Sequence, residues 1–103
     1  MALDTHMKQV PGKKRGDVLL FALSTCGWCR KTKDLLGDLG VEYRYIDVDL
    51  LDSEAKSEAI KVITKWNPSC SFPTLVINND ECIVGYQADK TREALGNGED
   101  VEV

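Results

Sequence analysis

The sequence predicts a single α/β domain with the element order β-α-β-α-β-β-α. Three observations predict it: an unbroken apolar run, two segments whose apolar side chains recur every three or four residues, and a late pair of short apolar runs around a turn. A strand, a helix and a strand in succession require a parallel pair, and a closing hairpin adds antiparallel strands. We therefore expect a four-stranded mixed sheet with three helices.

The composition is typical of one small globular domain. The chain has 103 residues, of which 43% are hydrophobic and 29% charged. Its formal net charge of −4 argues against nucleic acid as a partner. The longest apolar run, 18–23, is far shorter than the ~20 residues of a membrane-spanning helix. Since no signal-peptide pattern is present either, we expect a cytoplasmic protein without membrane contact.

We divide the chain into three parts. Residues 1–17 are polar and contain glycine and proline, which predicts a loose N-terminal arm. Residues 18–96 form the expected domain, and residues 97–103 form an acidic C-terminal tail.

The first strand and helix follow directly from the pattern. The run 18–23 is apolar on both faces, which is typical of a fully buried strand. From Trp28 to Leu39 the apolar residues share one helix face, and Gly40 ends the helix. Lys33, with its charged neighbours, is assigned to the opposite face.

The remaining elements follow in order. Residues 43–49 are aromatic and β-branched, which predicts a strand, and Asp52 or Ser53 begins a helix that reaches Trp66. The runs 74–77 and 82–86 flank a polar turn and predict a hairpin. Asp89 is expected to cap a short last helix.

The four cysteines indicate redox chemistry. Cys26 and Cys29 form a Cys-x-x-Cys unit between the buried strand and the first helix. A helix N-terminus favours a thiolate, so we expect Cys26 to attack a disulfide and Cys29 to resolve the mixed disulfide. Cys70 and Cys82 are isolated and are assigned to packing, and the alternative for Cys70, two residues before Phe72, is a regulatory or accessory thiol near the active site. They do not form a second Cys-x-x-Cys, so no zinc or other metal site is expected.

Three segments resemble the glutaredoxin family. They are the active-site segment 23–36, the proline loop and following strand 71–77, and the glycine–aspartate turn 84–90. They occur in the family's order, and the resemblance covers about residues 17–96.

The resemblance implies a thioredoxin-like fold in which Pro73 is cis and faces the two cysteines. A cis bond there would direct the backbone N–H and C=O of Phe72 at a substrate, which could pair with them as a strand does. The resemblance assigns the following residues to substrate binding: Thr25, Gly27, Trp28, Phe72, Pro73, Gly85, Tyr86 and Asp89.

Two departures from the family argue against glutathione. Glutathione-using members have basic residues where this chain has Leu23 and Ser24, and basic or amide residues where it has Ser69 and Cys70. Gly85-Tyr86 stands where a Gly-Gly pair is usual. The turn is more similar to that of the hydrogen donors of ribonucleotide reductase, which are reduced by thioredoxin reductase or a similar flavin enzyme.

We therefore expect a monomeric thiol-disulfide oxidoreductase without a tightly bound cofactor. Its partners would be a disulfide-containing protein or small molecule and a reductase such as thioredoxin reductase. One alternative is a carrier in which two chains share a 2Fe–2S cluster, a binding function that some glutaredoxins have. Another is a redox sensor whose disulfide alters a contact with a partner.

Overall fold

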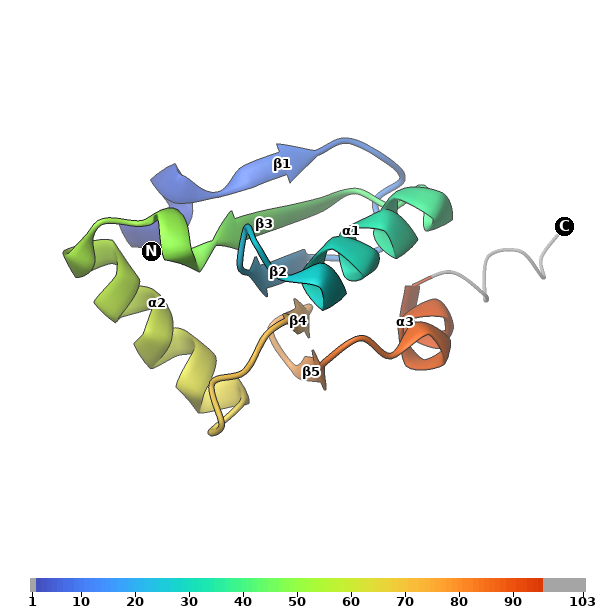
Figure 1. Ribbon diagram of the computed structural model, residues 1–103. Coiled ribbons are helices and arrows are strands. Elements are labelled where there is room, and N and C mark those ends of the chain that lie inside the picture. The colour runs from blue at the N-terminus through green and yellow to red at the C-terminus, as the bar shows by residue number, and fades with distance from the viewer. Residues whose placement is uncertain (1, 96–103) are drawn as a thin grey trace, which may run out of the picture.

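A computed structural model describes residues 2–95 (Figure 1). In chain order its elements are η1 (Ala2–His6), β1 (Lys8–Val10), β2 (Val18–Ala22), α1 (Gly27–Leu39), β3 (Tyr43–Asp47), η2 (Val48–Leu50), α2 (Ser53–Trp66), β4 (Thr74–Ile77), β5 (Glu81–Val84) and α3 (Ala88–Leu95). The predicted α/β order with three α-helices is confirmed. Residue 96 of the predicted domain and the predicted tail, 97–103, lie outside the described residues.

The sheet has five strands rather than the predicted four, in the order β1-β3-β2-β4-β5. The β2–β3 pair is parallel and every other pair is antiparallel. The additional strand, β1, runs along β3 at the edge of the sheet (Figure 1).

The loose arm predicted for residues 1–17 is corrected by the same observation. Lys8 lies opposite Tyr45 and Val10 opposite Tyr43, so the arm supplies hydrogen-bond partners that the outer edge of β3 would otherwise lack. Leu3 is fully buried with the apolar residues beneath α2. Burial of this side chain offsets part of the entropy lost when the segment is ordered.

The apolar residues form one cluster on each face of the sheet. The cluster on the α1 and α3 face includes Leu20, Leu36 and Leu95. The cluster on the other face includes Phe21 and Ile63 and contains the contacts of the sheet with α2 and η1. β2 is buried along its whole length because its alternate side chains enter both clusters, as its apolar sequence predicts.

The ends of the elements follow local sequence signals with one exception. Gly40 ends α1 in the left-handed conformation at φ 69°, and the Asp52 carboxylate accepts the N–H of Ala55 (2.8 Å) at the start of α2. Asp89 was predicted to cap the last helix, but it lies inside the first turn of α3. A cap at Asp89 would start the helix at Lys90, but α3 starts two residues earlier, at Ala88, because the Gln87 carbonyl already accepts the N–H of Thr91 (3.0 Å). No helix within residues 2–95 has the length and apolar character needed to cross a membrane.

Candidate active site

Cys26 is the N-cap of α1, and its sulfur takes part in the cap. The backbone N–H of Cys29 donates to the Cys26 Sγ (3.2 Å), and the carbonyl of Cys26 accepts the N–H of Arg30 (3.1 Å). A sulfur at this place faces unsatisfied N–H groups and the positive end of the helix dipole. The local geometry therefore directs helix N–H donors at the Cys26 sulfur.

The second cysteine lies in a different environment. Cys29 is fully buried, whereas Cys26 is partly exposed. Burial, aided by the hydrogen bond to Cys26, raises the pKa of the Cys29 thiol to about 12. The backbone N–H of Leu23, which donates to the Cys29 Sγ (3.5 Å), acts in the opposite direction. The pair thus has one accessible sulfur and one that is protonated and enclosed.

The loop that precedes β4 borders the same region. Its Phe72–Pro73 peptide bond is cis, as the resemblance implied. The Phe72 side chain packs against the cluster that Cys26 also touches. Among residues 2–95 the backbone N–H and C=O of Phe72 have no hydrogen-bond partner, and Gly85 donates its N–H to the carbonyl of Pro73 (2.8 Å). A backbone donor and a backbone acceptor therefore remain available in the loop that, like Cys26, packs against the α1-side cluster.

An aromatic pair joins α1 to the turn before α3. Trp28 stacks on Tyr86 with ring centroids 5.8 Å apart, and Lys31 Nζ lies 4.9 Å from the centre of the Trp28 ring. The helical pattern placed Trp28 at the start of the buried face of α1. In the structure 57% of it is exposed, whereas Cys29, the next residue in the same turn, is fully buried, so the buried face of α1 begins at Cys29.

The other predicted substrate-binding residues separate into two groups. Thr25 and Gly27 are exposed on either side of Cys26. Asp89 has a fully exposed side chain, and Arg92 lies 3.7 Å from it. The structure thus brings the aromatic pair, the proline loop and Gly85 together, whereas within residues 2–95 no hydrogen bond or ion pair joins Asp89 to this group.

Two carboxylates near the cysteines were not predicted as part of the site. Both Ser24 groups donate to Asp49, the N–H to Oδ1 (2.8 Å) and the hydroxyl to Oδ2 (2.6 Å), and these bonds lower the pKa of Asp49. Lys33 is turned toward β3, where it pairs with Asp47 (3.0 Å), instead of facing solvent. The spacing of Lys33, four residues after Cys29, makes these two residues neighbours on α1 but carries no signal for the contact with Asp47 on β3.

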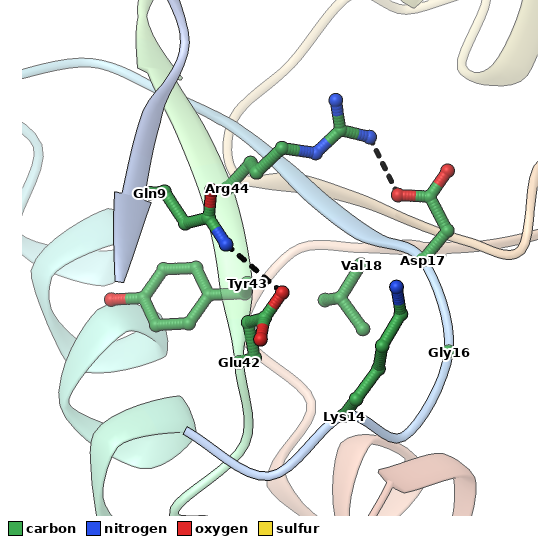
Figure 2. A pocket seen from close by; sticks show the side chains of 8 residues that line it. All are labelled: Gln9, Lys14, Gly16, Asp17, Val18, Glu42, Tyr43 and Arg44. Atoms are coloured by element: carbon green, nitrogen blue, oxygen red, sulfur yellow. Dashed lines mark hydrogen bonds and ion pairs between the residues drawn. The ribbon is translucent and has the colours of Figure 1, made fainter. Parts of the chain in front are cut away.

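A pocket of about 290 Å³ opens elsewhere, between β1, residues 14–18 and β3 (Figure 2). Arg44 pairs with Asp17, and Gln9 donates to Glu42 (2.9 Å), so these polar groups on its wall already have partners. The pocket adjoins the beginning of β2, whereas Cys26 follows the end of that strand. It is therefore separate from the cysteine pair.

No recorded contact within residues 2–95 joins Cys70 or Cys82 to the Cys26–Cys29 pair. Cys70 packs against the α2-side cluster, and burial raises the pKa of Cys82. Among the described residues, no three His, Cys, Asp or Glu side chains gather as metal ligands would.

Comparisons with known proteins agree with this geometry. A family model described as glutaredoxin matches residues 18–83. The gene 56 protein of Mycobacterium phage L5 is 33% identical over 78 residues, which make up 76% of this chain and 71% of that protein.

Two solved structures are similar over most of their length. The methanoredoxin of Methanosarcina acetivorans is 52% identical with a TM-score of 0.82, over 84% of this chain and 90% of that chain. The glutaredoxin from Methanosarcina mazei Go1 is 46% identical with a TM-score of 0.83, over 89% of each chain. The thioredoxin-like fold that the resemblance implied is confirmed.

Proposed function

This chain belongs to the glutaredoxin family, and from that premise we propose that it reduces disulfides of proteins or small molecules with Cys26 as nucleophile and Cys29 as resolving thiol. The hydrogen bond from the Cys29 N–H to the Cys26 Sγ (3.2 Å) carries the proposal. It directs partial positive charge at the sulfur that solvent can reach, and a thiolate is the species that attacks disulfides.

The reaction has two thiol steps. The Cys26 thiolate attacks one substrate sulfur, forms a mixed disulfide and releases the other sulfur as a thiolate, which takes a proton from water. Cys29 then gives its proton to water and attacks the Cys26 Sγ. The bond from Cys26 to the substrate breaks, the second substrate sulfur leaves and is protonated, and a Cys26–Cys29 disulfide remains. Two electrons have passed to the substrate, and a reductant must return two.

The substrate groove in this proposal lies between the proline loop and the aromatic pair. The free backbone groups of Phe72 would pair with an extended substrate segment, with Pro73 shaping the wall beside them. Trp28 and Tyr86 would supply apolar surface. Gly85, which has no side chain, would leave room for the substrate. The predicted roles of Thr25, Gly27 and Asp89 remain predictions.

We propose thioredoxin reductase or a similar flavin enzyme, rather than glutathione, as the reductant. Glutathione carries two carboxylates, which cationic side chains would bind. Leu23 and Ser24 carry no charge, and the Asp49 carboxylate bonded to Ser24 adds negative charge to this side of the loop.

A cytoplasmic location is part of the proposal, because a reducing compartment keeps the pair in its dithiol form. The 2Fe–2S cluster carrier and the redox sensor remain predictions, and no contact recorded among residues 2–95 favours either of them.

A coupled turnover assay on a small disulfide tests both parts. It compares NADPH with thioredoxin reductase against glutathione with glutathione reductase, and Cys26→Ser is the blank. We expect turnover with thioredoxin reductase and none in the blank. Turnover with glutathione alone would contradict the proposed reductant. Activity that survives Cys26→Ser but not Cys29→Ser would contradict the assigned roles.

A further inference from the structure

The second thiol step requires a thiolate at a buried position. Cys29 is fully buried, and the raised pKa of its thiol means that it is almost entirely protonated near neutral pH. A nearby cation would make the loss of its proton easier. The structure contains one such cation on the same face of α1.

That cation is Lys33, one helical turn beyond Cys29. Residues four apart on a helix are neighbours, with Cβ atoms about 5–6 Å apart. The Lys33 ammonium lies 3.0 Å from Asp47 Oδ1 and 4.2 Å from the centre of the Tyr45 ring. The side chains of Lys33 and Asp47 are only 25% and 13% exposed. Two partners on β3 therefore hold this charge in a region where water screens it weakly.

We propose that the Lys33–Asp47 ion pair controls the second thiol step, with Lys33 stabilising the Cys29 thiolate and Asp47 holding Lys33 in place while offsetting part of its charge. The inference rests on the proposed dithiol function. Neither side chain reacts with a sulfur, so both act as positioning residues. Consistent with this, the charge of Lys33 acts to lower the pKa of the Cys29 thiol, and burial, which raises that pKa, has the larger effect.

Few other titratable groups face Cys29. The α1 and α3 side of the sheet contributes Cys26 and the phenols of Tyr43 and Tyr45. Cys82 lies opposite Val76 in the strand pair and so faces the other side, where Cys70 also packs. The charged residues of α3 are exposed: Asp89, Lys90, Arg92 and Glu93. Lys33, paired with Asp47, is thus the partly buried cation that acts on the resolving thiol among the described residues.

Substitutions of Lys33 and of Asp47 are expected to change the formation of the Cys29 thiolate in opposite directions. Lys33→Met removes the cation, so the Cys29 thiolate becomes harder to form. Asp47→Asn keeps an oxygen that can accept from Lys33 but removes the offsetting negative charge, so the thiolate becomes easier to form. Simple loss of packing would slow the step in both variants. Opposite signs therefore distinguish electrostatic control from structural damage.

The test is a single turnover of dithiobis(nitrobenzoate), whose halves absorb visible light once released as thiolates. It uses the full chain with Cys70→Ala and Cys82→Ala, so that only the active-site pair reacts. The first release reports attack by Cys26, and the second reports attack by Cys29 on the mixed disulfide. The rate of the second release is followed against pH.

We expect Lys33→Met to raise the pH midpoint of the second release by roughly 0.5–1 unit, which makes that release about three- to tenfold slower at neutral pH. Asp47→Asn should lower the midpoint, and Lys33→Arg should restore it. Lys61→Met makes the same charge change on α2, across the sheet, and should leave the midpoint unchanged. The first release should remain within about twofold in all variants.

The outcomes separate the inference from the function on which it rests. If neither release occurs, or if the first survives Cys26→Ser, the proposed function is wrong. If the first release is normal and Lys33→Met keeps the parent midpoint, the inference is wrong. A shift in the same direction for Lys33→Met and Asp47→Asn would also overturn it. If Lys33→Met does not fold, Asp47→Asn and Lys33→Arg still decide the sign.

Discussion

The side-chain amide of Asn67 donates to the hydroxyl of Thr74 (3.1 Å) across the loop that carries the cis proline, and both side chains are buried. The same amide reaches the carbonyl (3.2 Å) and hydroxyl (3.0 Å) of Ser71. One residue after the end of α2 therefore fixes the path of the chain up to the start of β4. The position of Phe72, which like Cys26 packs against the α1-side cluster, depends on this network.

Asn67→Ala should destabilise the fold by about 1–3 kcal/mol, because buried polar groups lose their partner. The Thr74 hydroxyl would keep its bond to the Ser71 carbonyl (2.8 Å), which limits the cost. Urea unfolding measures the change. Thr64→Ala, which removes an exposed hydroxyl from α2, is the control and should cost less than about 0.5 kcal/mol. Equal effects of the two variants would contradict a structural role for the amide.

Asp49 gives the fold an acid-sensitive contact. The hydrogen bonds from Ser24 lower the pKa of Asp49 below its usual 3.8, so its unfolded-state pKa is the higher of the two. The stability that the bonds contribute is complete above the unfolded pKa and is lost as pH falls through the folded pKa. Thermal unfolding between about pH 7 and pH 2 should show this loss in the parent. Asp49→Asn should not show it, and parallel curves would count against the contact.

The Trp28–Tyr86 stack should be measurable as a coupling energy. A double-mutant cycle with Trp28→Ala and Tyr86→Ala isolates it, and urea unfolding gives the four stabilities. We expect a coupling of about 0.5–1 kcal/mol, in the lower part of the range for aromatic pairs, because more than half of Trp28 is exposed. Additive effects would mean that the rings are adjacent without stabilising each other.

The elements that the sequence predicts well are those specified by neighbouring residues. The apolar run of β2, the helical period of α1 with Gly40 after it, and the hairpin of β4 and β5 each contain their own signal. The predicted strand 43–49 is shorter in the structure, where β3 ends at Asp47 and a 3₁₀ turn begins at Val48. Such boundaries depend on tertiary contacts, so local patterns locate them less well.

The features that sequence reasoning missed depend on contacts between distant segments. β1 is a polar strand of three residues, and it forms only because β3 provides a partner. A helical projection places Lys33 on the solvent-facing side of α1. The residues near it in sequence do not indicate that Asp47 of β3 lies opposite. For the candidate site, the sequence supplied both cysteines and the proline loop. It could not supply the ion pair and the Asp49 contact, which join β3 and η2 to the active-site segment.

The pairing of β1 with β3 also affects the tendency of this protein to aggregate through strand pairing between copies at high concentration. An exposed strand edge is a template on which other chains can add strands and begin aggregates. Here the outer strands of the sheet are β1, with exposed Lys8 and Gln9, and the four-residue β5, with exposed Glu81. Short edges that carry polar and charged side chains are poor templates. The N-terminal strand thereby protects the central strands from intermolecular pairing.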